Sequence, residues 1–176
     1  MDFKEILKER IHPYDIRRIC ELCRGACGDL RKEELFLLAE DSDNRISYNA
    51  LWVFTYFSPY ERKWLESRRN DLIDWLLATT HTGKRRLILT LLERQKVGRE
   101  DIRTDYLDFC LSGINSTEPY GIRALCIKQA FAQCRHYPEL LQELKSEIEM
   151  MDYGELSPGL VSARKNISKK IAKLGI

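Results

Sequence analysis

A regular spacing of glycines is the feature that most limits how this chain can fold. Gly83, Gly121 and Gly159 lie 38 residues apart, each near the start of a stretch with helical periodicity. A further step of 38 towards the N-terminus reaches Arg45, at the start of another such stretch. Apolar residues recur in the same register, in the sets Leu51, Leu89 and Ile127 and, with Lys84 interrupting, Ile46, Ile122 and Leu160. Such self-similarity is typical of repeat proteins.

The helices between these stretches repeat as well, with a spacing of 34. Residues 71–75, 105–109 and 139–143 align, and each segment begins with an acidic residue. Two helices per 34–38 residues indicate an α-solenoid, because one helical hairpin cannot bury its apolar face alone and stacked neighbours form a continuous core. We therefore expect an all-α fold, a right-handed α-α superhelix of about five antiparallel helical hairpins.

Composition and helix signals support ten helices. Only 9 Gly and 5 Pro occur in 176 residues, and residues with high helix propensity dominate. Gly28 is predicted to end the second helix in the left-handed conformation, and Ser58 and Pro59 are predicted to begin the fifth. The predicted helices span 2–10, 13–27, 29–40, 45–57, 59–80, 82–95, 101–112, 117–136, 138–151 and 158–174.

The sequence also indicates a compartment. No apolar run approaches the ~20 residues that a membrane span requires, and the N-terminal residues do not form a secretory signal. We therefore expect a cytoplasmic protein that makes no contact with a membrane and keeps its six cysteines reduced.

Two segments share a pattern in which a turn is followed by an Arg and a helix of small and apolar residues. They are residues 41–51, with Arg45 after an acidic turn, and residues 119–125, with Arg123. This pattern resembles the HEAT-repeat family. The resemblance covers residues 29–174, with 1–28 as an atypical N-terminal cap hairpin in a single domain, 1–176. Residues 82–95 depart from the pattern, because three consecutive basic residues replace the usual single Arg.

The resemblance implies a curved scaffold for macromolecules, whose second helices line the concave face, and it implies no chemistry. At the level of the fold, the chain is also similar to the DNA alkylation repair branch of HEAT-like proteins, whose basic concave face holds duplex DNA. A catalytic Asp–aromatic cleft cannot be matched residue by residue in this sequence.

Charge is divided unevenly between the first and the second helix of each pair, although the net charge is only +2. The second helices and their caps (13–27, 44–57, 82–95, 117–136 and 157–174) carry +12, and the rest of the chain carries −10. A basic concave face attracts polyanions or acidic protein surfaces, whereas the alternative is an ordinary solvated surface. The predicted partner-binding residues are Arg45, Lys84, Arg85, Arg86, Arg123, Lys128, Arg164 and Lys165.

An aromatic stripe follows the fourth predicted helix. Tyr48, Trp52 and Tyr56 recur every four residues and therefore share one face. They form either a contact platform for a partner or a base, or a surface for helix packing. Core packing is predicted for three further aromatic residues of this region, Phe54, Phe57 and Trp75.

The spacing of three cysteines is compatible with a set of metal ligands. Cys20, Cys23 and Cys27 fall on one face of the second predicted helix, but a straight helix spreads their sulfurs over ~10 Å, too far for one tetrahedral ion. Core packing is therefore favoured for these three, as for the later cysteines, Cys110, Cys126 and Cys134. We expect no metal and no cofactor.

No nucleotide-binding, hydrolase or lyase signature occurs in the sequence. The sequence thus favours a non-enzymatic interaction scaffold whose partner is an acidic protein surface or nucleic acid. A DNA-binding HEAT-like module and an enzyme with an unrecognised site remain alternatives, and the sequence specifies no oligomeric state.

Overall fold

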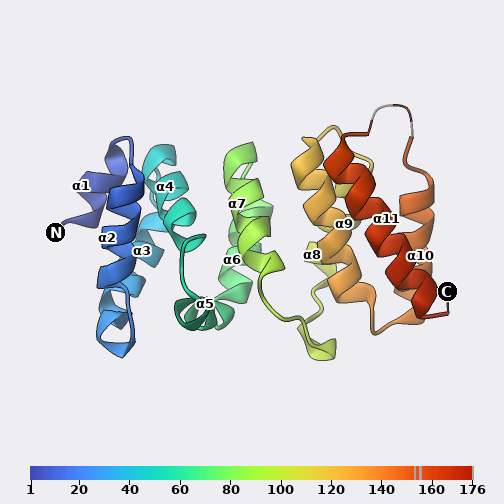
Figure 1. Ribbon diagram of the computed structural model, residues 1–176, viewed down its shortest axis with the longest axis horizontal. Coiled ribbons are helices and arrows are strands. Elements are labelled where there is room, and N and C mark those ends of the chain that lie inside the picture. Colours follow the sequence, from blue (N-terminus) through green and yellow to red (C-terminus); the bar gives the residue numbers. More distant parts are fainter. Residues whose placement is uncertain (153, 155, 176) are drawn as a thin grey trace. The chain divides into compact units, whose positions relative to one another are not determined.

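The computed structural model describes residues 1–152, 154 and 156–175 (Figure 1). These residues form eleven α-helices, two short 3-10 turns and no strand, which confirms the all-α prediction. The 3-10 turns are η1 (Ala26–Gly28) and η2 (Arg99–Asp101). The helices are α1 (Phe3–Lys8), α2 (Pro13–Leu22), α3 (Asp29–Ala39), α4 (Asn44–Phe54), α5 (Pro59–Glu66), α6 (Arg69–Ala78), α7 (Thr82–Glu93), α8 (Thr104–Ile114), α9 (Tyr120–Cys134), α10 (Pro138–Glu149) and α11 (Pro158–Lys173).

The 38-residue register coincides with the starts of four helices. Gly83, Gly121 and Gly159 are the second residues of α7, α9 and α11, and Arg45 is the second residue of α4. The six apolar residues that recur in this register are buried: Leu51, Leu89, Ile127, Ile46, Ile122 and Leu160. In the 34-residue register, the equivalent buried residues of α6, α8 and α10 are Ile73, Leu107 and Leu141.

The second helix ends at Leu22, five residues earlier than predicted. Gly25, rather than Gly28, has a positive φ, 62°, and its ψ of −169° is one that residues other than glycine rarely adopt at that φ. Gly28 is required for another reason, since a Cβ there would lie 2.4 Å from the carbonyl carbon of Cys23. Because the helix stops early, Cys27 leaves the α2 face and is exposed in η1, so the prediction of core packing is wrong for this cysteine.

Two buried charged side chains hold the turn that follows α2. The Gly25 N–H donates to Glu61 Oε1 at 3.3 Å, and Lys32 Nζ donates to the Gly25 carbonyl at 3.0 Å. Lys32 also pairs with Asp29, and the Ser58 hydroxyl donates to Glu61. Only 2% of Lys32 and 6% of Glu61 is exposed. Buried charges need such partners, so this cluster fixes where α2 ends.

The predicted helix 59–80 is two helices, α5 and α6, because the chain turns at Ser67 and Arg68. The Ser67 hydroxyl donates to the Trp64 carbonyl at 2.8 Å and satisfies an acceptor that the helix end leaves open. The Arg68 guanidinium lies 5.3 Å from the ring centroids of both Phe36 and Trp64, and it pairs with Glu33. Contacts with α3 therefore set this break.

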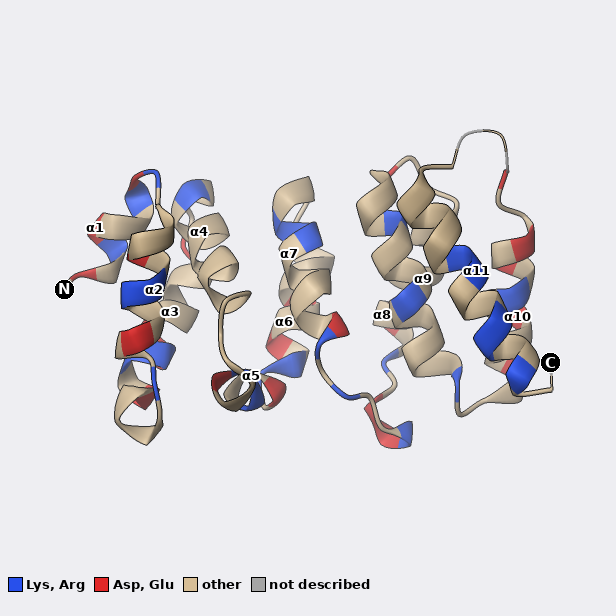
Figure 2. Ribbon diagram, in the orientation of Figure 1, with Lys and Arg blue, Asp and Glu red and all other residues tan. Residues whose placement is uncertain are grey.

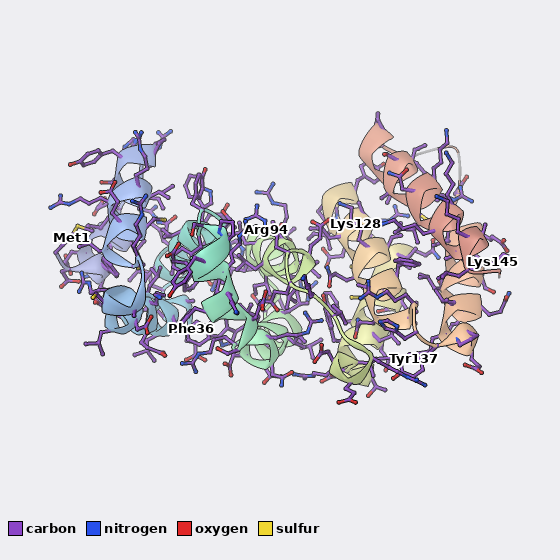
Figure 3. All side chains as sticks on the ribbon, turned by 60° about the horizontal axis from the view of Figure 1, so that its bottom comes forward. Met1, Phe36, Arg94, Lys128, Tyr137 and Lys145 are labelled. Carbon is purple, nitrogen blue, oxygen red and sulfur yellow. The ribbon has the colours of Figure 1, made fainter. Side chains whose placement is uncertain are left out.

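The chain forms two compact units, Met1–Leu91 and Leu92–Ile176. In the first unit, α4 packs against α1, α2 and α3. Phe36, labelled in Figure 3, lies in a cluster of aromatic rings. The centroid of the Phe36 ring lies 4.5 Å from that of Trp75 and 6.2 Å from that of Phe54. Phe54 and Phe57 are buried, as predicted. Trp75 is half-buried and donates its indole N–H to Glu40 at 2.7 Å.

In the second unit, α9 packs against α8, α10 and α11. Because α8 also contacts α10, the unit has an α8/α10 layer and an α9/α11 layer (Figure 1). Fully buried Tyr106 donates its hydroxyl to Gln129 across the layers at 3.0 Å. The cysteines of this unit, Cys110, Cys126 and Cys134, are buried as predicted.

Candidate partner-binding surfaces

Three of the eight predicted basic residues are engaged at helix ends, and one of them, Arg45, donates from Nη1 to the Lys8 carbonyl at the end of α1 at 3.3 Å. Arg85 Nε donates to the Thr79 carbonyl after α6, and Arg123 Nε donates to the Ile114 carbonyl at the end of α8, each at 2.8 Å. Backbone acceptors at a helix C-terminus lack helical partners, and the helix dipole favours a cation there. Arg85 and Arg123 are 38 residues apart, so the same stabilising contact recurs in successive repeats.

The sequence predicts that Arg164 lies on the partner-binding face, but the residue is buried, with only 8% of its surface accessible. It belongs to the buried stripe of α11, together with Leu160, Ala163, Ile167 and Ile171. Its neighbour Lys165 is exposed. The sequence placed both residues on the second helix of a pair, but the packing of α11 separates them.

The other basic residues of the predicted face are more accessible. Arg45, Arg86 and Lys128 are exposed, whereas Lys84 is half-buried. Desolvation by burial lowers the pKa of the Lys84 ammonium, against the opposing effect of the Asp43 carboxylate. These residues remain available as charges for a partner.

A hollow of about 530 Å³ lies in the first unit between α4 and the turn that joins α1 to α2. We call it the α4 hollow, and its lining residues are Glu9, Arg10, Ile11, His12, Pro13, Arg45, Tyr48, Asn49 and Trp52. It brings together the predicted residues Arg45, Tyr48 and Trp52, but it also contains Arg10 and His12, which sequence reasoning missed. The 38-residue register could have indicated Arg10 and His12, because it aligns residues 7–14 with residues 45–52 of the next repeat.

The three residues of the aromatic stripe have different environments. Tyr48 is half-buried, and its ring packs 5.9 Å from that of His81, centroid to centroid. A Cβ on Gly83 would lie 2.8 Å from the Tyr48 ring, so the glycine leaves room for it. Trp52 is half-buried with its ring edge-on to exposed Tyr56, their centroids 6.4 Å apart. Tyr48 and Trp52 line the hollow, and Tyr56 does not.

The second unit has a groove along the seam between α9 and α11. It consists of two adjoining hollows of about 560 and 360 Å³ that share Lys128, Ala163 and Asn166. We call them together the α9–α11 groove. The larger hollow contains four cations, Lys96, Lys128, Arg135 and Lys170, and one carboxylate, Glu93. Its apolar lining includes Phe131, Ala132, Ala163 and Ile167.

The cations of this groove are held in place by neighbouring groups. Lys128 pairs with Glu93 at 2.7 Å, and Arg135 Nη2 donates to the Val97 carbonyl at 2.7 Å. Lys170 Nζ lies 5.6 Å from the centroid of the Phe131 ring. These contacts orient the three side chains, and Glu93 balances only one of the four positive charges in the larger hollow.

Charge separates between the two layers of the second unit (Figure 2). The predicted second helices here, 117–136 and 157–174, carry +2 and +5, and their first helices, 99–115 and 138–151, carry −2 and −3. Lys128 of the α9/α11 layer and Lys145 of the α8/α10 layer are both labelled in Figure 3. The positive charge therefore belongs to the layer that contains the groove.

The surroundings of three cysteines, Cys20, Cys23 and Cys134, disfavour chemistry at their thiols. Burial raises the pKa of the Cys20 thiol to about 11 and those of Cys23 and Cys134 to about 12, so these thiols stay protonated near neutral pH.

No group of three or more His, Cys, Asp or Glu side chains that could hold a metal ion occurs among the residues described. None of the described helices is both long and apolar enough to cross a membrane.

The chain matches a known family of repeat proteins. A family model described as a HEAT repeat domain covers residues 3–171, and so includes most of the segment 1–28 that the sequence pattern set apart as a cap. No curated protein and no solved structure matches the chain. No comparison supports the similarity to DNA alkylation repair proteins.

Proposed function

Because the chain belongs to the HEAT-repeat family, we propose that it is a non-enzymatic scaffold that binds the acidic surface of another protein through the basic layer of its second helices. HEAT repeats are generally protein-interaction scaffolds. The family supports the class of function, and the distribution of charge supports the chemistry of the partner.

The observation that carries this proposal is the α9–α11 groove. Positive charge from α9, α11 and Lys96 surrounds an apolar lining that includes Phe131 and Ile167. An acidic segment with some apolar side chains matches both properties, because carboxylates pair with the cations and apolar groups contact the lining. Nucleic acid matches the charge but makes less use of the apolar lining.

The proposal also includes Arg45, Lys84 and Arg86, which lie on second helices of the first unit, and Lys165 of α11. Arg85 and Arg123 contribute positive charge but have a structural contact as well. Arg164 is left out because it is buried.

Matched charge variants test the proposal. The full chain is titrated with a fluorescent polyglutamate peptide and with random duplex DNA of the same charge, from ~50 to ~200 mM salt. Lys128→Gln with Lys170→Gln removes two cations from the groove, and Lys63→Gln with Lys145→Gln removes two from first helices. The groove variant should bind polyglutamate about five- to tenfold more weakly, since each exposed ion pair contributes up to about 1 kcal/mol.

The control variant should bind polyglutamate with an affinity within about twofold of that of the unmodified protein. It loses the same two positive charges as the groove variant, but the α9–α11 groove is left intact. Equal weakening by both pairs of substitutions would show attraction by net charge alone and would overturn the proposal. Tighter binding of duplex DNA, with a steep dependence on salt, would identify nucleic acid as the partner instead.

A further inference from the structure

The α4 hollow of the first unit combines Arg45, which also belongs to the proposed acidic-protein surface, with Arg10 and two aromatic rings that the acidic-protein proposal does not use. We propose that it binds an aromatic phosphate, presented as the phosphotyrosine side chain of a partner protein. The inference rests on guanidinium groups and half-buried aromatic rings that line one hollow, and it is independent of the α9–α11 groove.

The wall of the hollow is fixed by a buried amide. Asn49 Nδ2 donates to the Leu7 carbonyl at 2.9 Å and to the Glu9 carbonyl at 3.1 Å, and only 6% of Asn49 is exposed. These bonds fasten the end of α1 to α4. The turn that presents Arg10 and His12 is therefore positioned before a ligand arrives, which reduces the entropy lost on binding.

The phosphate would be recognised by Arg10 and Arg45. Arg45 Nη1 donates to the Lys8 carbonyl at 3.3 Å, and this contact orients the guanidinium while leaving its other N–H groups for a ligand. Guanidinium groups bind phosphate in a planar, bidentate geometry. Glu9 is the one carboxylate among the lining residues, so positive charge prevails in the hollow.

The aromatic ring of the ligand would be recognised by Trp52 and Tyr48. Both are half-buried, so each combines a supported ring with an accessible surface. Tyr48 is supported by the His81 ring and Trp52 by the Tyr56 ring. Stacked or edge-on contacts with a ligand ring add to the charge interaction. Phosphoserine has no ring for these contacts, and unmodified tyrosine has no charge for the arginines.

A volume of about 530 Å³ accommodates one such side chain. The α9–α11 groove differs, because Phe131 is the one aromatic residue among those that line its larger hollow. A ligand that needs both guanidinium groups and aromatic rings is therefore assigned to the α4 hollow.

The test uses the full chain and four small probes: N-acetyl phosphotyrosine amide, the corresponding tyrosine and phosphoserine amides, and adenosine monophosphate. Binding is followed by ³¹P NMR or calorimetry. We expect saturable binding of the phosphotyrosine probe, at least ~10-fold tighter than that of the phosphoserine and tyrosine probes. Equal affinity for phosphoserine, tighter binding of the nucleotide, or no saturation by ~10 mM would each overturn the proposal.

Three variants locate the binding. Arg45→Lys keeps the charge but loses the planar fork, and it should weaken phosphotyrosine binding about tenfold. Trp52→Leu should weaken phosphotyrosine binding about fivefold and leave phosphoserine binding unchanged. Arg18→Lys, on the exposed surface of α2, is the matched control for Arg45→Lys and should change affinity by less than about twofold.

Circular dichroism identifies any variant that fails to fold, and Arg10→Gln then replaces it as a second test of the phosphate contact. If Arg45→Lys and Arg10→Gln both fold and both bind like the unmodified chain, the phosphate does not occupy the hollow. The Lys128→Gln and Lys170→Gln variant should retain phosphotyrosine binding, so the failure of one proposal is distinguishable from the failure of the other.

Discussion

Gly113 shows how the space around a single atom controls packing in the second unit. A Cβ at this buried position of α8 would lie 2.7 Å from Cys126 Sγ of α9. Gly113→Ala should therefore destabilise the protein by about 1–2 kcal/mol, because the cost of overpacking exceeds the gain in helix propensity. Cys126→Ala should make room for the new methyl group.

Urea unfolding of the two single variants and the double variant measures this coupling. The double variant should be more stable than the sum of the single effects predicts, by about 1 kcal/mol. Additive effects would show that the Gly113–Cys126 contact does not limit the approach of α8 to α9.

Glu61 links the stability of the first unit to pH. Burial raises its pKa, but hydrogen bonds from the Ser58 hydroxyl and the Gly25 N–H outweigh that effect, so its pKa lies below the ordinary value of 4.5. The unfolded chain then binds a proton more readily than the folded one, and stability is lost as the pH falls below about 4.5. Glu61→Gln should be less stable at pH 7 and should decline less steeply in acid.

Thermal unfolding from pH 7 to pH 3 measures the effect of this substitution, with Glu66→Gln on the exposed surface of α5 as the control. Asp41 and Asp105 also have lowered pKa values, through hydrogen bonds from Lys4 and Arg103 respectively, so replacing Glu61 removes only part of the slope. An unchanged slope in Glu61→Gln would contradict the role of the buried cluster.

At the scale of elements, the turn after α2 depends on two glycines for two different reasons. Gly25 has a positive φ and open space around it, so Gly25→Ala should cost about 1–2 kcal/mol from backbone strain alone. Gly28→Ala should cost more, because its Cβ would meet the backbone of Cys23. Gly121→Ala, at an open helical position, should be neutral or stabilising.

Thermal unfolding ranks these three variants. An equal effect of Gly25→Ala and Gly121→Ala would mean that the positive φ of Gly25 is not required. Gly25→Asn should recover none of the loss, because Asn tolerates a positive φ mainly with ψ near +45°, whereas the ψ of Gly25 is −169°.

Helix starts were easier to predict than helix ends. The 38-residue register placed the second residues of α4, α7, α9 and α11, because glycine spacing and apolar periodicity are local signals. The end of α2 and the break between α5 and α6 depend on Lys32, Glu61 and Arg68. These residues act through contacts with distant parts of the chain, so local periodicity could not reveal them.

The candidate surfaces were predictable only in part for a similar reason. Sequence assigns a charged residue to a helix, but packing decides which side of the helix it occupies. Thus Lys128 and Arg45 line hollows, Arg164 is buried, and Arg85 bonds to a helix end. Arg10, His12 and Lys96 lie in turns or loops, and only the fold brings them to the lining of a hollow.

At the scale of the whole molecule, the central claim is that the basic layer of second helices receives an acidic partner. The most direct measurement is an ¹⁵N-resolved NMR titration of the full chain with a polyglutamate peptide at low salt. The account predicts that amide shifts concentrate on α9, α11 and residues 93–97, and that they disappear as salt is raised towards ~0.5 M. Shifts centred on α8 and α10, or an absence of saturable shifts at low salt, would contradict it.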